Sequence, residues 1–328
     1  MSSKLKFLLF ILLTLSFLII VVIGGKYIVI KKEKYTLLKE NSLLCKKNKS
    51  ILNSFRHRFT GVLLKDEDGS EVFVDPQDNI VSNYLILNGS WESHVRNVIK
   101  QIVKPGMRVV CLGGHIGVHE ILISRLVGSS GRVFVFEPNP KILKYTKANI
   151  YFSYNNNITL FEKAAYSENT KLEFSSLKAD ENSGHSHIIF DEAIIEDNAD
   201  RIVVDAITLD SISELEKGID VIQMDIEGAE IDAIYGAKKL IENSANLIVI
   251  QEWDIKMMGT ERVPKYIKFW RDQGYKFAEI VSSGDKLVEK TDTELMVLMH
   301  TDIVIAKNLD EIIANFKPYV KPVIMDEQ

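Results

Sequence analysis

Cysteine and proline are scarce in this chain, and neither sign of charge dominates it. Of 328 residues, two are cysteine (Cys45 and Cys111) and seven are proline. Two cysteines supply no disulfide framework, so a reducing compartment is the simpler prediction for the folded part. The few prolines and the lack of a low-complexity segment argue against long disordered regions. A net charge of −5 gives no sign of a basic surface, so we expect no nucleic-acid partner.

One long uncharged run stands at the N-terminus, FLLFILLTLSFLIIVVIGG over residues 7–25. As a helix it would be about 28 Å long, close to the thickness of a hydrocarbon core. We expect a membrane anchor over residues 1–25 rather than a signal peptide, because no clear cleavage site follows. Lysines are more frequent after the run than before it, which predicts a single-pass protein with its catalytic part in the cytoplasm. Residues 26–58 are predicted to form a basic juxtamembrane stalk.

Residues 59–310 have the pattern of one folded domain, followed by a tail over residues 311–328. A hairpin over 59–75 and a helix over 83–103 come first. Buried strands then alternate with amphipathic helices: strands over 107–114, 132–138, 158–166, 219–228 and 246–254, helices over 115–128, 139–154 and 229–245. This alternation predicts a doubly wound, Rossmann-like α/β sheet with ligands at the carboxyl ends of its strands. The polar residues 168–200 interrupt the alternation and are expected to form a flap.

The first strand of this sheet leads into a glycine-rich turn, RVVCLGGHIGVHE. Gly113 and Gly117 let the backbone approach a ligand, and a helix N-terminus offers unpaired N–H donors. Glu137 ends the second strand, where a carboxylate can accept hydrogen bonds from two ribose hydroxyls. Together these features indicate an adenosine-containing cofactor. A purely structural turn and a nicotinamide cofactor, which normally uses G-x-G-x-x-G, are the alternatives.

Three carboxylates follow a later strand in the sequence QMDIEGAE: Asp225, Glu227 and Glu230. They would repel a nucleotide phosphate but would favour a cationic sulfonium, which points to S-adenosylmethionine. An acidic residue in the first turn of a helix complements the helix dipole, and this explains Glu230. It does not explain Asp225, which is still within an apolar strand.

These motifs carry a specific resemblance. The sequence VKPGMRVVCLGGHIGVHEILISRLVGSSGRVFVFEPNP, with IDVIQMDIEGAEIDAIYGAKKLI and IVIQE, resembles the FkbM-type methyltransferases over roughly residues 70–308. The family consists of class I, S-adenosylmethionine-dependent enzymes with a Rossmann-like fold, many of which O-methylate sugars, polyketides or other hydroxylated metabolites. The resemblance implies a methyltransferase that uses S-adenosylmethionine. With the anchor, it suggests a hydroxylated metabolite, a glycan or a lipid-linked saccharide as the acceptor.

Three positions depart from the family pattern. The family usually has Asp at the position of Cys111, often Asn at that of His115, and Lys at that of Gln223. The usual Asp helps to anchor the methionyl end of the cofactor, and a thiol cannot replace its charge. Losing a charged hydrogen bond costs about 1.5–3 kcal/mol, or one to two decades of affinity.

The resemblance and the residue chemistry together give the expected site. We expect catalytic roles for Asp225, Glu227 and His115, with Glu230 behind them, because an alcohol acceptor needs a base. His115 would either act as that base or cap the following helix. The residues expected to bind the cofactor are Cys111, Gly113, Gly114, His115, Gly117, Glu137, Asp225 and Glu92.

Several other features have simpler interpretations. Glu92 and His94 in SWESHV resemble positions that line the cofactor cleft, although an exposed surface role is expected for His94. His185 and His187 have no clear third ligand, so no metal is expected. The aromatic cluster around Trp270 has helical spacing and is expected in the core.

The rival functions are a catalytically silent binding domain and a nicotinamide-dependent oxidoreductase.

Overall fold

The chain divides into two compact units. The computed structural model describes residues 28–29, 62–75, 77–153, 156–176, 183–190 and 199–319. The units are Met1–Trp91 with Ala179–Ser183, and Glu92–Lys178 with Gly184–Gln328. The second unit contains the central sheet and all of the residues discussed below as a site.

The smaller unit contains the predicted hairpin. Strands β2 (Val62–Lys65) and β3 (Glu71–Val74) pair antiparallel, and β1 (Ile28–Val29) pairs with β2 in parallel. The side chain of Asp66 fixes the turn, because its Oδ1 accepts the N–H groups of Asp68 and Ser70 at 3.0 and 2.7 Å. This confirms the hairpin that the turn residues predicted.

The single helix expected over residues 83–103 is two helices. They are α4 (Val81–Asn88) and α5 (Ser93–Ile102). Gly89 ends α4 with φ +73°, and Glu92 precedes α5 with φ +46°. Both backbones are left-handed, which a continuous helix cannot accommodate.

The central sheet has eight strands among the described residues, in the order β14-β13-β15-β12-β11-β4-β5-β6. Strands β4, β5, β6, β11 and β12 are parallel to one another, whereas β15 is antiparallel to both of its neighbours, β12 and β13. The bounds are β4 (Arg108–Leu112), β5 (Arg132–Phe136), β6 (Ile158–Phe161), β11 (Val221–Met224), β12 (Ile248–Trp253), β13 (Lys276–Ile280), β14 (Leu287–Glu289) and β15 (Thr301–Ala306). The first strand, β4, lies between β5 and β11, so the strand order reverses beside it. A ligand crevice is expected at such a point.

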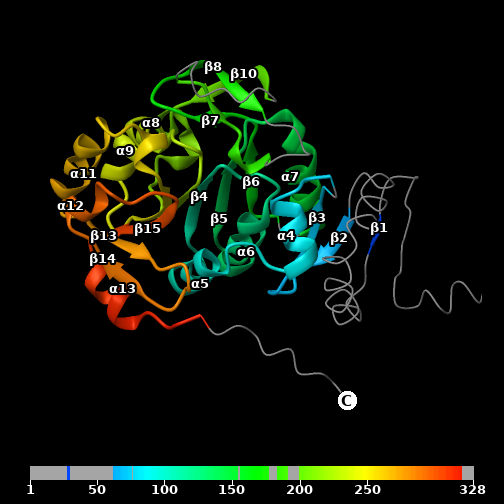
Figure 1. Ribbon diagram of the computed structural model, residues 1–328, viewed down its shortest axis with the longest axis horizontal. Coiled ribbons are helices and arrows are strands. Elements are labelled where there is room, and N and C mark those ends of the chain that lie inside the picture. Colours follow the sequence, from blue (N-terminus) through cyan, green and yellow to red (C-terminus); the bar gives the residue numbers. More distant parts are fainter. Residues whose placement is uncertain are drawn as a thin grey trace, which may run out of the picture. The chain divides into compact units, whose positions relative to one another are not determined.

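Helices cover both faces of this sheet (Figure 1). One hydrophobic core joins the sheet to α5, α6 (Val118–Val127) and α13 (Leu309–Asn315). The other joins it to α8 (Glu230–Tyr235), α9 (Lys238–Glu242), α10 (Ile255–Met258) and α11 (Val263–Arg271). Trp270 is fully buried in this second core, as predicted. The remaining α-helices of the described residues are α7 (Pro140–Phe152) and α12 (Asp292–Leu295).

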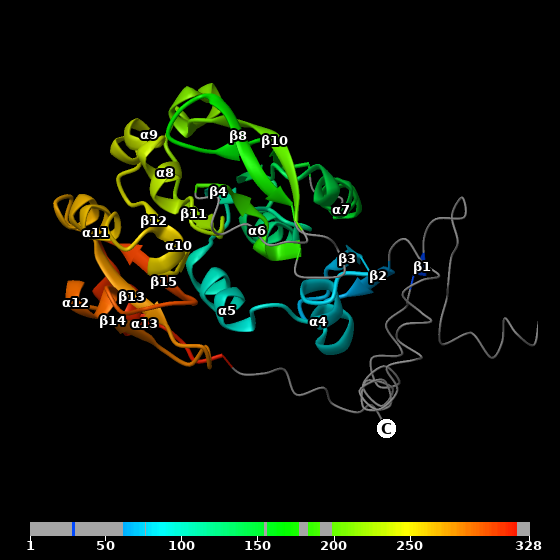
Figure 2. The same ribbon diagram turned by 45° about the horizontal axis from the view of Figure 1, so that its top comes forward.

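A second, smaller sheet accounts for much of the interruption after β6. Its order is β7-β10-β8-β9, from β7 (Ala164–Ala165), β8 (Thr170–Ser176), β9 (His187–Ile188) and β10 (Asp200–Ile207). Short 3-10 turns flank these strands at η2 (Ser183–His185), η4 (Leu209–Ser211) and η5 (Ser213–Leu215). Figure 2 shows β8 and β10 as a paired ribbon apart from the central sheet. Its apolar side packs against Ile226 and Ala229, in the turn that follows β11.

The helix expected over residues 229–245 is also divided, into α8 and α9. Gly236 lies between them, and a Cβ at this residue would be 2.0 Å from the carbonyl oxygen of Tyr166. The close approach of the smaller sheet therefore requires glycine here, and the helix breaks at this contact.

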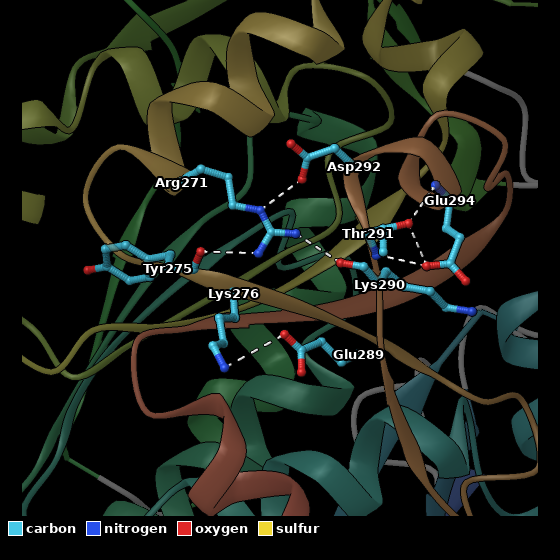
Figure 3. A network of polar contacts seen from close by, with 8 residues as sticks. All are labelled: Arg271, Tyr275, Lys276, Glu289, Lys290, Thr291, Asp292 and Glu294. Atoms are coloured by element: carbon cyan, nitrogen blue, oxygen red, sulfur yellow. Dashed lines mark hydrogen bonds and ion pairs between the residues drawn. The ribbon is translucent and has the colours of Figure 1, made fainter.

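A polar network ties α12 and the segment after β14 to α11 (Figure 3). The Arg271 guanidinium donates to Asp292 Oδ1 and to the carbonyl oxygen of Lys290, each at 2.9 Å. Thr291 and Glu294 form a capping box at the start of α12. These contacts stabilise the edge of the sheet farthest from the glycine-rich turn.

The described residues contradict the predicted membrane location. Among them, no helix is both long enough and apolar enough to cross a bilayer. The longest, α7, has 13 residues and is about 20 Å long, against a hydrocarbon core of about 30 Å. The predicted anchor over residues 1–25 lies outside the described residues. The predicted stalk lies outside them as well, except for Ile28–Val29, which form a strand rather than part of a helix.

Candidate active site

The glycine-rich turn joins β4 to α6 and packs against the backbones of two other strands. Gly113 has φ +81°, and a Cβ at this residue would lie 1.9 Å from the carbonyl oxygen of Asp225. A Cβ at Gly114 would lie 2.5 Å from Cγ1 of Val135. The N–H groups of both glycines donate to the carbonyl oxygen of Phe136, at 3.0 and 2.9 Å. Glycine is therefore required at both positions, and the turn is fixed between the ends of β5 and β11.

His115 belongs to this turn and not to the helix. The helix α6 begins at Val118, and Gly117, with φ +90°, is its N-cap residue. His115 has φ +41°, and its carbonyl oxygen accepts a hydrogen bond from the Thr146 hydroxyl. The interpretation of His115 as a helix cap is therefore wrong. Its role as a base remains a prediction.

Backbone donors hold the carboxylate of Glu137 at the end of β5. Its Oε2 accepts the N–H of His115 and its Oε1 accepts the N–H of Asn139, each at 2.7 Å. Burial raises the pKa of Glu137 to about 7, against the opposing effect of these two donors. Each carboxylate oxygen can accept a second hydrogen bond. The group is therefore fixed in place and can still accept hydrogen bonds from ribose hydroxyls.

Asp225 and Glu227 lie in a cluster of carboxyl groups at the ends of β11 and β12. One oxygen from each of Asp225, Glu227 and Glu252 lies within 4.8 Å of the other two. The register of β11 and β12 places Asp225 beside Glu252, because the residues just before them are paired. Asp302 of β15 pairs directly with Glu252. Acidic residues from three adjacent strands therefore meet at one edge of the sheet.

The carboxyl groups of this cluster hold their protons to high pH. Burial, followed by the charges of Glu92 and Asp302, raises the pKa of Asp225 to about 8. Burial and the charge of Asp225 raise the pKa of Glu227 to about 9 and that of Glu252 to about 11. Carboxylates at this separation cannot all ionise without a nearby cation. The cluster is therefore suited to a positively charged ligand.

Two histidines pair with carboxylates at the border of the cluster. His94 Nε2 lies 2.9 Å from Asp302 Oδ2, and His119 Nε2 lies 3.0 Å from Glu92 Oε2. Burial lowers the pKa of His94, but the hydrogen bond and charge of Asp302 outweigh it, so the net shift is upward. The His94 side chain is 23% exposed, so the expected exposed role for it is wrong. Glu92 is close enough to raise the pKa of Asp225, which brings it to the site.

Cys111 lies in the core and not on the surface of the site. Its side chain is 0% exposed and belongs to the hydrophobic cluster between the sheet and α6. Burial and the charge of Glu120 raise the pKa of its thiol well above the usual range. Gln223 of β11 is paired with Cys111. The two positions at which the resembling family usually has Asp and Lys are therefore neighbours, and both are uncharged here.

Three acidic residues of the site were missed in the sequence. Glu252 ends an apolar strand, which is the same signal that identified Asp225, so it could have been found. Asp302 starts the antiparallel strand β15, and only the strand order places it at this edge. Glu120 is buried in the first turn of α6, where burial and the charges of Glu137 and Asp225 raise its pKa to about 8. Nothing in the sequence separates Glu120 from an ordinary acidic residue at a helix N-terminus.

Comparison with known proteins adds a family and several distant structures. The model of the methyltransferase FkbM domain matches residues 112–277, just over half of the chain. This range contains the glycine turn, Glu137 and the carboxylates from Asp225 to Glu252, but not Glu92, Cys111 or Asp302. A search of curated proteins found no match.

The similar solved structures include methyltransferases. Fibrillarin from Aeropyrum pernix, with natively bound S-adenosyl-L-methionine, is 14% identical, with 74% of this chain and 92% of that chain covered and a TM-score of 0.39. TYW2 from M. jannaschii, in complex with AdoMet, is 15% identical, with 75% and 85% covered and a TM-score of 0.41. The O-methyltransferase TomG from Streptomyces achromogenes, in complex with SAM, is 10% identical, with 65% and 76% covered and a TM-score of 0.36. These similarities are too distant to decide the chemistry of this chain.

The residues of the site fit S-adenosylmethionine. The glycine turn permits close approach of a ligand at the strand-order reversal, and Glu137 has acceptor capacity for a ribose. The carboxyl cluster provides the negative environment that a sulfonium needs. The chain belongs to the FkbM methyltransferase domain family and is an S-adenosylmethionine-dependent methyltransferase.

Proposed function

We propose that this methyltransferase acts on a hydroxyl oxygen of a glycan or of another hydroxylated metabolite. The observation that supports this is the group of Asp225, Glu227 and Glu252, whose oxygens lie within 4.8 Å of one another. An alcohol has to lose a proton when it is methylated, and a carboxylate can accept that proton. The lipid-linked saccharide expected from the sequence depended on the membrane anchor and is not retained.

The glycine turn and Glu137 are proposed to hold the cofactor. The turn at Gly113, Gly114 and Gly117 would lie against the cofactor, and the Glu137 carboxylate would accept hydrogen bonds from the ribose hydroxyls. His115 and Glu92, which border the turn and the cluster, are proposed neighbours of its methionyl part. Cys111 would support the turn from the hydrophobic core rather than contact the cofactor, because its thiol is fully buried. When bound, S-adenosylmethionine supplies a methyl group on a positively charged sulfur.

Asp225 and Glu227 are proposed to accept the proton of the acceptor hydroxyl, with His115 as a further candidate base. The hydroxyl oxygen forms a bond to the methyl carbon while the bond from that carbon to sulfur breaks. In the free chain the pKa values of Asp225 and Glu227 are about 8 and 9. A nearby positive charge lowers the pKa of a carboxyl group. Binding of the cofactor would therefore convert these carboxyls into bases at neutral pH.

The smaller sheet is proposed to border the acceptor. Its apolar side packs against Ile226 and Ala229. These residues lie beside the proposed catalytic residues in the chain. The flap expected over residues 168–200 includes β8 and β9 of this sheet and stays a prediction. Because acceptor pockets are built from such variable segments, this sheet is the first place to look for acceptor specificity.

Turnover by the purified full-length chain tests the proposal. The chain would be incubated with S-adenosylmethionine and a panel of sugars, glycosides and polyols, and the products analysed by mass spectrometry. We expect S-adenosylhomocysteine and an acceptor that has gained one methyl group as an ether. Asp225→Asn should lower the rate at least ~100-fold, whereas the exposed Glu242→Gln, on α9, should leave it unchanged.

Three outcomes would contradict the proposal. Tight binding of S-adenosylhomocysteine without turnover on any acceptor would favour a catalytically silent domain, for which Cys111 is the supporting observation. Methylation of nitrogen or carbon acceptors alone would retain the methyltransferase and reject the hydroxyl acceptor. Binding of NADH in place of S-adenosylhomocysteine would revive the oxidoreductase alternative.

A further inference from the structure

When ionised, the carboxyl cluster has more negative charge than its known partners can balance. His94 pairs with Asp302, and His119 pairs with Glu92. The ion pairs of the described residues include none for the cluster's three central acids: Asp225, Glu227 and Glu252. One sulfonium brings a single positive charge. If all three acids were ionised, the cluster would therefore lack about two positive charges even with the cofactor bound.

The geometry of the three central acids suits a single ion. Each contributes an oxygen, and these oxygens lie within 4.8 Å of one another. Oxygen ligands of Mg²⁺ lie at about 2.0–2.1 Å and those of Ca²⁺ at about 2.3–2.6 Å, so opposite ligands are roughly 4–5 Å apart. The three oxygens can therefore reach one ion with little movement. Carboxylates are hard ligands, which select Mg²⁺, Mn²⁺ or Ca²⁺ over softer metals.

A buried oxygen of Glu230 independently indicates a missing ligand. Its Oε1 accepts the N–H of Ile226, at 3.1 Å, in the turn between Asp225 and Glu227. Its Oε2 has no hydrogen-bond partner, although the residue is only 1% exposed. The carboxyl lies close enough to Glu227 and Glu252 to raise the pKa of both. The Glu230 carboxyl therefore lies near the three central acids.

Gln223 provides a second buried oxygen of this kind. Its Oε1 has no hydrogen-bond partner, and the residue is 5% exposed. Gln223 lies two residues before Asp225, so the two side chains are on the same face of the sheet. A buried polar group without a partner costs about 1–3 kcal/mol. A hydrated cation in the cluster would supply partners to both oxygens, because its bound waters are strong donors.

We propose that Asp225, Glu227 and Glu252 bind one divalent cation of the magnesium type, with Glu230 and Gln223 interacting with its water ligands. The ion would lie at the carboxyl ends of β11 and β12, next to the glycine turn. Its chemical role rests on the proposed function: an acceptor hydroxyl bound to the ion would give its proton more readily to His115 or to a carboxylate oxygen of Asp225 or Glu227 that does not bind the ion, and would be held in position for methyl transfer. This proposal departs from the expectation that the chain binds no metal, which was argued from His185 and His187; these two residues take no part in this site.

Titration with Mn²⁺ tests the site without requiring any acceptor. The full-length chain would be freed of metal with a chelator and then titrated at pH 8, with free Mn²⁺ measured by electron paramagnetic resonance. We expect one Mn²⁺ per chain, displaced by excess Mg²⁺ or Ca²⁺. Glu252→Gln and, as a second variant, Asp225→Asn should each weaken binding at least tenfold. Glu242→Gln, an exposed change on α9, should bind Mn²⁺ like the native chain.

The outcomes separate this proposal from the proposed function. A chain that binds S-adenosylhomocysteine but no Mn²⁺ overturns the metal site. Equal Mn²⁺ binding by the native chain, Glu252→Gln and Asp225→Asn overturns it as well. Full methyl-transfer activity in excess chelator would reject the ion and leave the methyltransferase intact. Specific Mn²⁺ binding in a chain that methylates no hydroxyl would support the ion and reject the acceptor.

Discussion

Glu137 and Glu252 are both acidic residues at the carboxyl end of a strand in one sheet, yet they differ in their donors. Two backbone N–H groups donate to the carboxylate of Glu137, and its pKa is raised by burial to about 7. Glu252 is less buried, yet burial and then the charges of neighbouring carboxyl groups raise its pKa to about 11. Burial is the largest cause of both shifts, and the difference between the two pKa values comes from the backbone donors at Glu137 and the neighbouring charges at Glu252. On the two proposals above, the chain itself supplies the groups that bind the ribose, whereas the carboxyl cluster needs a cation.

The largest expected effect comes from adding a carboxylate at a buried position that has no positive charge to pair with it. Cys111→Asp would place an acid at a fully buried position near Glu120, with uncharged Gln223 as its neighbour in the sheet. An unpaired buried charge costs about 3–5 kcal/mol. We expect the free energy of unfolding, measured in urea, to fall by about this amount.

Two control variants sharpen this prediction. Cys111→Asn has nearly the shape of Cys111→Asp without the charge and should lose less stability. Adding Gln223→Lys to Cys111→Asp should recover part of the loss, because the new charges would be neighbours. If the single Asp variant were as stable as the Asn variant, the buried position would tolerate charge and the argument from donors would be wrong.

Removing the carboxylate that has donors should weaken cofactor binding. Glu137→Gln keeps one oxygen acceptor but loses the charge, and its amide N–H₂ would oppose one of the two backbone donors. Charged hydrogen bonds are worth about 1.5–3 kcal/mol, so the affinity for S-adenosylhomocysteine should fall about 10–100-fold. Calorimetric titration measures this. Unchanged affinity would show that the ribose lies elsewhere.

The pH dependence of binding isolates the same group. Glu137 has a pKa of about 7 in the free chain, and the ionised form is the better acceptor for ribose hydroxyls. Affinity for S-adenosylhomocysteine should therefore be about tenfold weaker at pH 6 than at pH 8. Other carboxyls titrate in this range, so the comparison is with Glu137→Gln, in which this part of the pH dependence should disappear. Identical profiles for the two proteins would contradict the assignment.

Cofactor binding should strengthen as the pH rises, but the contribution of Glu137 to the stability of the cofactor-free chain should decrease. The folded pKa of Glu137 lies above its unfolded value of about 4.3, so its contribution to stability is fully present below that value. The contribution is lost as the pH rises through about 7. Binding should therefore improve over the pH range in which the cofactor-free fold weakens, and thermal unfolding across this range checks the trend.

The smallest expected effect is a gain in stability on the acidic side. Burial and the charges of Asp225 and Glu227 raise the pKa of Glu252 to about 11, so this carboxyl has to take up a proton when the chain folds at pH 8. Glu252→Gln places a neutral amide there, which needs no proton. In metal-free buffer at pH 8 the free energy of unfolding should rise by about 1 kcal/mol. With excess Mn²⁺ the order should reverse, since only the native chain gains from the ion. A variant that is less stable than the native chain in both buffers would contradict this.

The sequence predicted the parts of the fold that depend on local patterns. The alternation of buried strands and helices predicted the α/β sheet, and the spacing around Trp270 predicted its burial. The breaks at Gly89 and Gly236 were missed. Gly236 in particular is explained by a contact with Tyr166 that is distant in the chain. The smaller sheet was missed although β8 and β10 each alternate apolar and polar residues. Their pairing joins segments that are about 30 residues apart, and no local pattern indicates it.

The candidate site divides in the same way. The glycine turn and Glu137 were found because a turn and a strand end are local features. Asp225 and Glu227 were found from a short acidic motif, but their crowding with Glu252 and Asp302 depends on the order of β11, β12 and β15. That order is set by packing of the whole sheet. The burial of Glu120 is equally a property of packing.

The position of β15 has a consequence for how the chain is made. It is the last strand that the structure describes, yet it lies inside the central sheet, between β12 and β13. On the ribosome these two strands emerge first and have no common neighbour until Thr301–Ala306 follow them. Asp302 arrives with this strand, so the acidic half of the site is assembled late in synthesis. A chain interrupted before Thr301 would expose two open strand edges, which are templates for aggregation.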